Sequence, residues 1–360
     1  MLWTLSVLTF VLAVFTALPW SKRTEWWIRG ADFPRTQFLV LGAALLAASI
    51  LFLDTESPHT WFILVVVSLC ILQQAYWILP YTPFARSEVK DAQKGARTPR
   101  LRLISANVLC PNPRRKEFLA LVEREDPDLL VTLETDSSWE DLLRPIEKRL
   151  PHTLRCPLDN LYGMHLYSRW PFRDARIQFL VEKDVPSMHL LLQHPEGPEI
   201  RVHILHPAPP SPTENETSSE RDAELVMVGK STRGSRFPII VTGDLNDVAW
   251  SRTTRLFRKL SGLLDPRIGR GFYNTFHAHW WPMRWPVDHV FHSDHFTLVE
   301  LRRLPAGGSD HFPMLVELAL EPGAAERQEG LSPDAEDKEQ AEETLAQEQV
   351  SPGAVHRPGG

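Results

Sequence analysis

The sequence predicts an α/β domain with a mixed β-sheet core, preceded by three transmembrane helices. Two observations lead to this fold class. Residues 1–83 contain three long apolar runs, whereas residues 100–320 contain short β-rich runs that alternate with stretches of helical periodicity. At 360 residues, the chain is long enough to bury one sizeable core and to carry appendages.

The three apolar runs cover about residues 2–18, 38–53 and 61–79. Each approaches the roughly 20 residues that a helix needs to cross a bilayer. A cleaved signal peptide is the alternative for the first run, but a basic start and a clear small-x-small cleavage site are missing. Buried soluble helices are the alternative for the other two. Tryptophans flank the runs and favour membrane spans, because Trp concentrates at membrane interfaces; they are Trp20, Trp26, Trp27, Trp61 and Trp77.

The flanking charges predict an orientation. The link between the first two runs carries Lys22, Arg23, Arg29 and Arg35, whereas residues 54–60 carry only acidic charges. More basic residues follow the third run. The positive-inside rule then places the first link and everything after residue 79 in the cytoplasm, with the N-terminus outside. If the first run is removed or fails to insert, the order of sides is inverted.

Residues 84–99 read as a polar linker, and residues 100–320 as one α/β domain. Strands are predicted at residues 101–105, 129–133, 164–167, 189–193, 200–205, 239–242, 289–292 and 314–318. Helices are predicted at residues 114–125, 138–150, 219–231 and 253–260. Residues 321–360 are rich in Glu, Gln, Pro, Ala and Gly, which predicts a disordered acidic tail.

Charge and cysteine content exclude some classes of function. The formal net charge of −6 argues against general nucleic-acid binding through bulk positive charge. Residues 100–320 also contain no long basic run that would line a groove for a duplex. The three cysteines, Cys70, Cys110 and Cys156, are far apart and lack C-x-x-C spacing, so neither a disulfide framework nor a zinc site is predicted.

Polar residues at the ends of predicted strands are the candidates for chemistry. Asn107 follows the strand at 101–105, and Glu134 follows the strand at 129–133. A buried strand that ends in such a residue delivers it to the sheet edge, where active sites of α/β proteins tend to lie. Taken singly, each residue could equally be a solvated loop residue.

A third candidate is the sequence Ile-Ile-Val-Thr-Gly-Asp-Leu-Asn-Asp at residues 239–247. Because side chains alternate along an extended chain, Asp244 and Asn246 are expected on one side. An Asp/Asn-rich turn is the alternative. The preceding β-branched run and Gly243 favour a functional role.

The last candidates are Asp288 and the sequence Gly-Gly-Ser-Asp-His-Phe-Pro at residues 307–313. His311 can act as a base if a carboxylate such as Asp288 holds its other ring nitrogen. Oxygen ligands such as Glu134 and Asp310 suit Mg²⁺ or Mn²⁺ better than Zn²⁺. The combination predicts hydrolysis of a phosphate ester.

These residues, in this order, resemble the endonuclease/exonuclease/phosphatase superfamily, the fold of type I deoxyribonuclease. The resemblance covers about residues 100–320 and depends on the joint presence of Gly-Asp-Leu-Asn at 243–246 and Ser-Asp-His at 309–311. Residues 26–29, 32–35 and 78–83 further resemble a bacterial membrane-bound branch. The resemblance implies a four-layer α/β sandwich, two mixed sheets with helices outside, in a multi-pass protein of the bacterial inner membrane. Its catalytic domain would be cytoplasmic by the charge rule, with the periplasm as the alternative.

The resemblance also implies a metal site for Mg²⁺ or Mn²⁺. Glu134 would be the principal ligand, with Asn107 beside it. Asp310 would be a further ligand or a partner of the bound ligands.

The resemblance assigns catalytic roles to the remaining residues. His311 would take a proton from the attacking water, and Asp288 would orient the His311 ring. Asp244 would position that water or aid proton transfer. Asn246 would bind a phosphate oxygen. His206 would bind phosphate or assist the leaving group, although the sequence there is Leu-His-Pro where relatives usually have Thr-His-Leu, and His203 is a rival.

Other residues near these motifs keep several interpretations. Arg270 and Arg284 could bind a second phosphate or be solvated. An aromatic cluster could pack the sandwich edge, stack a base or enter the membrane interface; it contains Phe272, Tyr273, Phe276, Trp280, Trp281 and Trp285.

The sequence therefore predicts a membrane-anchored, Mg²⁺-dependent phosphodiesterase or phosphomonoesterase. Its substrate could be a nucleic acid, a phospholipid head group or a small molecule; the lipid bilayer is the other expected partner, and no obligate protein partner is inferred. The alternative is an inactive, membrane-tethered binding or scaffold protein. Retention of Glu134, Asp244, Asn246 and His311 favours the enzyme.

Overall fold

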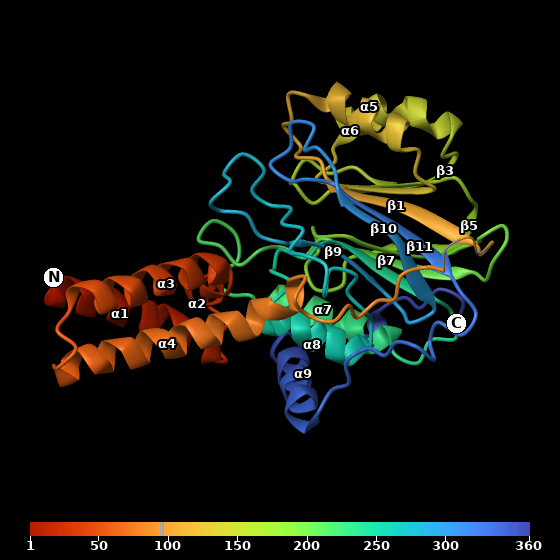
Figure 1. The fold of residues 1–360 in the computed structure, drawn as a ribbon. Helices are drawn as coiled ribbons and strands as arrows, with labels where there is room; N and C mark the ends of the chain where they lie inside the picture. Colours follow the sequence, from red (N-terminus) through yellow and green to blue (C-terminus); the bar gives the residue numbers. More distant parts are fainter. Residues whose placement is uncertain (94, 96) are drawn as a thin grey trace.

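Two β-sheets pack face to face, and helices cover their outer faces (Figure 1). The computed structural model describes residues 1–93, 95 and 97–360. One sheet has the strand order β10-β11-β1-β2-β4-β3 and the other β5-β6-β7-β8-β9. Both are mixed, because β1 is parallel to β2 and antiparallel to β11, and β7 is parallel to β8 and antiparallel to β6. The predicted four-layer α/β architecture is confirmed.

All eight predicted strands are present, and three more were missed. The first sheet contains β1 (Arg100–Asn107), β2 (Leu129–Leu133), β3 (His152–Cys156), β4 (Met164–Ser168), β10 (Phe296–Arg303) and β11 (Met314–Leu320). The second contains β5 (Phe172–Gln178), β6 (Ser187–Leu192), β7 (Ile200–Leu205), β8 (Ile239–Asp244) and β9 (Asp288–His292). The missed strands β3, β5 and β10 all lie at sheet edges. These three strands are only partly buried and lack the apolar runs that mark central strands.

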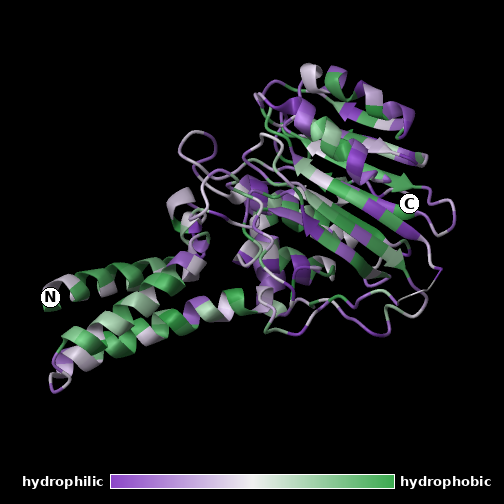
Figure 2. Cartoon of the chain, turned by 45° about the horizontal axis from the view of Figure 1, so that its top comes forward, coloured by the Kyte–Doolittle hydropathy of each residue, from purple (hydrophilic) through white to green (hydrophobic). Residues whose placement is uncertain are grey.

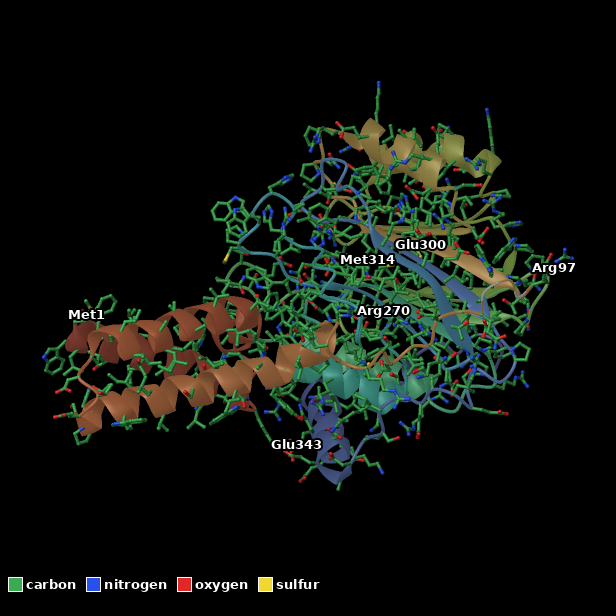
Figure 3. All side chains as sticks on the ribbon, in the orientation of Figure 1. Met1, Arg97, Arg270, Glu300, Met314 and Glu343 are labelled. Carbon is green, nitrogen blue, oxygen red and sulfur yellow. The ribbon has the colours of Figure 1, made fainter. Side chains whose placement is uncertain are left out.

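The helices form the two outer layers. On the first sheet lie α5 (Arg115–Glu125), α6 (Ser137–Leu143) and the 3₁₀ helix η4 (Arg144–Lys148), and on the second lie α7 (Ser219–Thr232) and α8 (Arg252–Ser261). The predicted helix at 138–150 is thus divided, because Pro145 has no backbone N–H with which to continue the α-helical hydrogen bonds. The largest buried apolar cluster fills the space between the sheets (Figure 3).

The C-terminal tail differs from the expected disorder. Residues after β11 include α9 (Ala335–Gln347) and the 3₁₀ helix η5 (Pro352–Ala354). Asp334 caps α9, and Ala341 and Leu345 are buried against the apolar layer under α7 and α8. Lys259 on α8 also pairs with Asp337 at 2.6 Å. Two apolar residues four positions apart lie on the same face of a helix, and that face can pack against the domain. The average composition of the tail, on which the prediction of disorder was based, does not reveal such a pair.

Three N-terminal helices are long and apolar enough to cross a membrane by length and composition. They are α1 (Leu2–Ala17), α3 (Arg35–Phe52) and α4 (Pro58–Ile78), close to the predicted bounds, and they lie side by side (Figure 2). The short elements η1 (Leu18–Trp20), α2 (Trp26–Arg29), η2 (Gly30–Asp32) and η3 (Leu79–Tyr81) lie at the end of this bundle nearest the sheets.

Hydrogen bonds join the bundle to the α/β domain. The backbone N–H of Trp26 donates to the carbonyl of Glu216 at 3.0 Å. The indole N–H of Trp250 donates to the carbonyl of Asp32 at 2.8 Å, and the Tyr81 hydroxyl donates to the carbonyl of Ala249 at 2.5 Å. The segments that flank α2 and follow α4 therefore pack directly on the domain.

Candidate functional site

The site lies where strands of both sheets end. Asn107 is the last residue of β1, Glu134 follows β2, and Asp244 is the last residue of β8. Asp288 begins β9 beside Asp244, its register partner. The side-chain amide Nδ2 of Asn107 reaches Asp244 Oδ2 at 3.2 Å, which joins the two sheets at this point.

Glu134, Asn107 and Asp310 form the oxygen-rich part of the site. Asn107 Nδ2 donates to Glu134 Oε1 at 2.7 Å. Burial raises the pKa of Glu134 to about 7, although the Asn107 hydrogen bond and the charge of His311 oppose this. Glu134 Oε2 and Asp310 Oδ1 are buried and have no hydrogen-bond partner among the described residues.

That arrangement fits a hard divalent cation. Unpartnered buried carboxylate oxygens are costly, and a cation coordinated by them would offset the cost. A second group of potential ligand atoms, on Asp244, Asp288 and His311, lies within 4.8 Å of one another. Asp288 Oδ1 is likewise buried without a hydrogen-bond partner among the described residues, so both groups offer free carboxylate oxygens.

His311 lies between two carboxylates. Its Nδ1 is 2.8 Å from Asp288 Oδ2, and its Nε2 is 3.6 Å from Asp244 Oδ2. Burial lowers the pKa of His311, but the Asp288 and Asp244 carboxylates outweigh this and raise it to about 10. Burial, followed by the charge of Asp288, raises the pKa of Asp244. The site thus stabilises positive charge on His311.

His206 and Asn246 also lie beside Asp244. His206 Nε2 is 4.0 Å from Asp244 Oδ2, and its Nδ1 is buried without a hydrogen-bond partner among the described residues. Burial lowers the pKa of His206 to about 4, so this imidazole is neutral at pH 7. Asn246 Nδ2 donates to the carbonyl of Pro207 at 3.0 Å, which uses one of its two N–H groups.

Asn246 reaches the site by a turn and not by the predicted strand alternation. β8 ends at Asp244, Asn246 has φ of +50°, and its backbone N–H donates to Asp244 Oδ1 at 2.9 Å. Glu134 likewise has φ of +58°. Such conformations are uncommon for residues other than Gly and cluster at functional sites.

Three residues that the sequence offered as phosphate-binding candidates are held by other contacts. His203 Nδ1 is 2.7 Å from His189 Nδ1 in the interior of the sheet, so His206 is the histidine at the site. Arg270 pairs with Asp91 at 2.6 Å. Arg284 donates to backbone carbonyls and stacks on Phe312.

Ser309, Thr275 and Phe276 support the site, a role that the sequence did not indicate for them. Ser309 Oγ donates to the Asn107 carbonyl at 2.8 Å and accepts from the backbone N–H of His311 at 2.9 Å. Thr275 Oγ1 accepts from the backbone N–H of Asp288 at 3.1 Å, and the Phe276 ring centroid is 4.9 Å from that of His311. Ser309 stands in the recognised motif and Phe276 in the predicted aromatic cluster, whereas local pattern gave Thr275 no signal.

Comparison with solved structures agrees with the fold. The human Nocturnin catalytic domain with bound sulfate is 18% identical, covers 62% of this chain and 94% of its own, and gives a TM-score of 0.52. An endonuclease/exonuclease/phosphatase from Beutenbergia cavernae is 17% identical, with coverage of 62% and 72% and a TM-score of 0.50. A humanized D. rerio TDP2 is 17% identical, with coverage of 61% and 99% and a TM-score of 0.50. No curated protein sequence matches the chain.

The two-sheet sandwich and the residues at its strand ends define a phosphoesterase fold. The model of the Endonuclease/Exonuclease/phosphatase family matches residues 104–311, and the chain belongs to this family.

Proposed function

We propose that the protein is a membrane-anchored, divalent-metal-dependent phosphoesterase that uses an activated water molecule. The observation that carries the proposal is the convergence of Asp288, His311 and Asp244 beside the unpartnered oxygens of Glu134 and Asp310. A binding protein would have no need for an imidazole held between two buried carboxylates.

Each residue of the site has a role in this reaction. Asp288 holds His311 by Nδ1, so Nε2 points toward Asp244 and removes a proton from the attacking water. Asp244 accepts a hydrogen bond from that water and positions it. His206, which is neutral, and the second N–H of Asn246 donate to phosphate oxygens.

Glu134, Asn107 and Asp310 would hold Mg²⁺ or Mn²⁺. When bound, the ion would polarise a phosphoryl oxygen and stabilise the leaving oxygen, and its charge would lower the pKa of nearby His311. These ligands contribute oxygen atoms only, in agreement with the preference of both ions.

Anchoring is proposed from α1, α3 and α4 as three membrane spans of a bacterial inner-membrane protein. The domain organisation is then a membrane region at 1–83, a linker at 84–99, a catalytic domain at 100–320 and a tail at 321–360. The basic residues of the first link favour the cytoplasmic side for the catalytic domain, with the periplasm as the alternative.

Hydrolysis of bis-p-nitrophenyl phosphate by the full chain in detergent tests the proposal. We expect activity with Mg²⁺ or Mn²⁺, loss with a chelator, and a fall of at least ~10²-fold in kcat for His311→Ala. His295→Ala, at an exposed histidine after β9, is the matched control. Activity that survives the chelator, or an unchanged rate in His311→Ala, would contradict the mechanism.

A further inference from the structure

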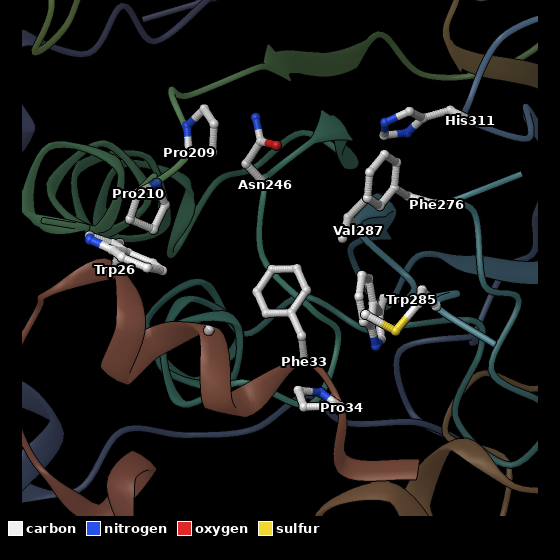
Figure 4. Close-up of a pocket in the computed structure, with 12 residues that line it drawn as sticks. Trp26, Phe33, Pro34, Pro209, Pro210, Asn246, Phe276, Trp285, Val287 and His311 are labelled. Carbon is white, nitrogen blue, oxygen red and sulfur yellow. The ribbon is translucent and has the colours of Figure 1, made fainter. Parts of the chain in front are cut away.

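A cavity of about 460 Å³ begins at the candidate site and extends toward the membrane region. His311 and Asn246 lie at its inner end (Figure 4). Most of its wall is apolar and includes Trp26, Phe33, Phe276, Met283, Trp285 and Val287. The polar groups proposed to handle phosphate thus open directly onto an apolar space.

The wall is built jointly by the membrane region and the catalytic domain. Trp26 and Phe33 belong to the segment between α1 and α3, whereas Trp285 precedes β9. The ring centroids of Phe33 and Trp285 are 5.4 Å apart in an edge-on contact. Gln37 Nε2 on α3 donates to the carbonyl of Pro282 at 2.6 Å, which fixes the two parts together. The apolar wall therefore adjoins the ends of the membrane helices.

Exposed aromatic side chains surround the same region. Trp280 and Trp281 are 65% and 79% exposed, and Trp26 and Trp27 are 40% and 48% exposed. Exposed tryptophans beside apolar helices are typical of the membrane–water interface, where the ring has one apolar and one wet side. With α1, α3 and α4 as the proposed membrane spans, these tryptophans would place the cavity at the level of lipid head groups.

Building on the proposed function, we propose that the substrate is an amphiphilic phosphoester with a long alkyl or acyl chain that resides in the bilayer. Its apolar chain occupies the cavity, and its phosphate lies at Asn246 and His311. Water attacks phosphorus, the P–O bond to the leaving group breaks, and the leaving oxygen takes up a proton, so no further reactant is required.

The composition of the cavity favours a lipid over a nucleic acid. Its lining residues, all in the described part of the chain, include neither Lys nor Arg. A polynucleotide would bring further phosphates into this space, and phosphate binding depends on basic side chains. An alkyl chain instead gains from each methylene that it buries there.

Alkyl p-nitrophenyl phosphates with ethyl, octyl and hexadecyl chains test the inference, because they share one leaving group and differ only in the tail. For the full chain in one detergent at fixed concentration, kcat/KM should rise up to ~4-fold for each methylene buried, and by ~10²-fold or more from ethyl to octyl. Longer chains also enter micelles more readily, so variants must separate this effect from binding in the cavity.

Gly30→Phe fills the cavity. Gly30 lines it, and a Cβ placed there has no atom within 4 Å. The ratio of octyl to ethyl kcat/KM should fall at least ~10-fold in Gly30→Phe and also fall in Met283→Gln, which replaces a half-exposed apolar wall residue. Gly353→Phe, at an exposed glycine of the tail, should keep the wild-type ratio.

The outcomes separate the two proposals. A wild-type chain-length ratio in both cavity variants, or faster cleavage of a single-stranded DNA oligonucleotide than of the hexadecyl diester, would overturn the lipid assignment alone. Failure of the wild-type protein to hydrolyse any of the three diesters or bis-p-nitrophenyl phosphate would overturn the proposed phosphoesterase itself.

Discussion

Replacing Asp288 with Asn tests how the site activates His311. Asp288 Oδ2 lies 2.8 Å from Nδ1, and together with Asp244 it outweighs burial to raise the pKa of His311 to about 10. Compared with the ordinary value of 6.5, this corresponds to roughly 5 kcal/mol in favour of the imidazolium. Because Asp288 makes the direct hydrogen bond to His311, we assign roughly half of this free energy to Asp288. That share lies in the range of hydrogen bonds to charged groups.

Because His311 gains positive charge when it removes a proton, that stabilisation is lost in the transition state of Asp288→Asn. Roughly 2–3 kcal/mol corresponds to a fall in kcat of about 30- to 150-fold, with little change in KM. The assay is steady-state hydrolysis of bis-p-nitrophenyl phosphate with saturating Mg²⁺. Asp294→Asn, at a half-exposed aspartate after the same strand, is the control. A wild-type kcat in Asp288→Asn, or an equal fall in Asp294→Asn, would refute the reasoning.

Three further predictions follow from particular residues. Glu134→Gln should raise the Mg²⁺ concentration for half-maximal activity ~10-fold or more, as read from metal titrations, whereas an unchanged titration would remove Glu134 from the metal site. Gly243→Ala should lower the free energy of unfolding by more than ~2 kcal/mol, measured as a fall in the thermal midpoint. The reason is that Gly243 has φ of +145° and an added Cβ would lie 1.9 Å from the Leu205 carbonyl oxygen. The control Gly353→Ala should leave the midpoint unchanged, and an equal fall in both variants would contradict this reason. Burial, and after it the charge of Glu182, raises the pKa of Glu224 from 4.5 to about 8. Between these pH values the folded state keeps a proton that the unfolded state has released, so the free energy of unfolding falls as the pH rises. Glu224→Gln should therefore raise the thermal midpoint at pH 9 and change it least at pH 4.5; an equal shift at both would exclude this titration.

Much of the fold follows from local pattern. Central strands such as β2 and β8 are buried on both faces, so they appear in the sequence as mainly apolar runs. Edge strands β3, β5 and β10 were missed because partial burial weakens that signal. The tail helix α9 was missed because Ala341 and Leu345 are few among charged residues.

The candidate site was also predicted in part. The order of the motifs along the chain predicted that Asn107, Glu134, Asp244 and Asp288 lie at strand ends, and the structure brings these residues together. Their catalytic roles stay predictions. The turn at Asn246 was the alternative to the preferred strand alternation, which cannot indicate where a strand ends.

The sequence by itself determined the fold class, the family motifs and the three apolar helices, because periodicity and residue order are local properties of the chain. Tertiary structure alone decided that Asn107 meets Asp244 across two sheets, that burial moves the pKa of Glu134 to about 7, and that Phe33 lies beside Trp285. Each of these depends on the packing of segments distant in sequence. The apolar cavity beside His311 exists for this reason, since the segment before α3 and the residues before β9 build its wall together.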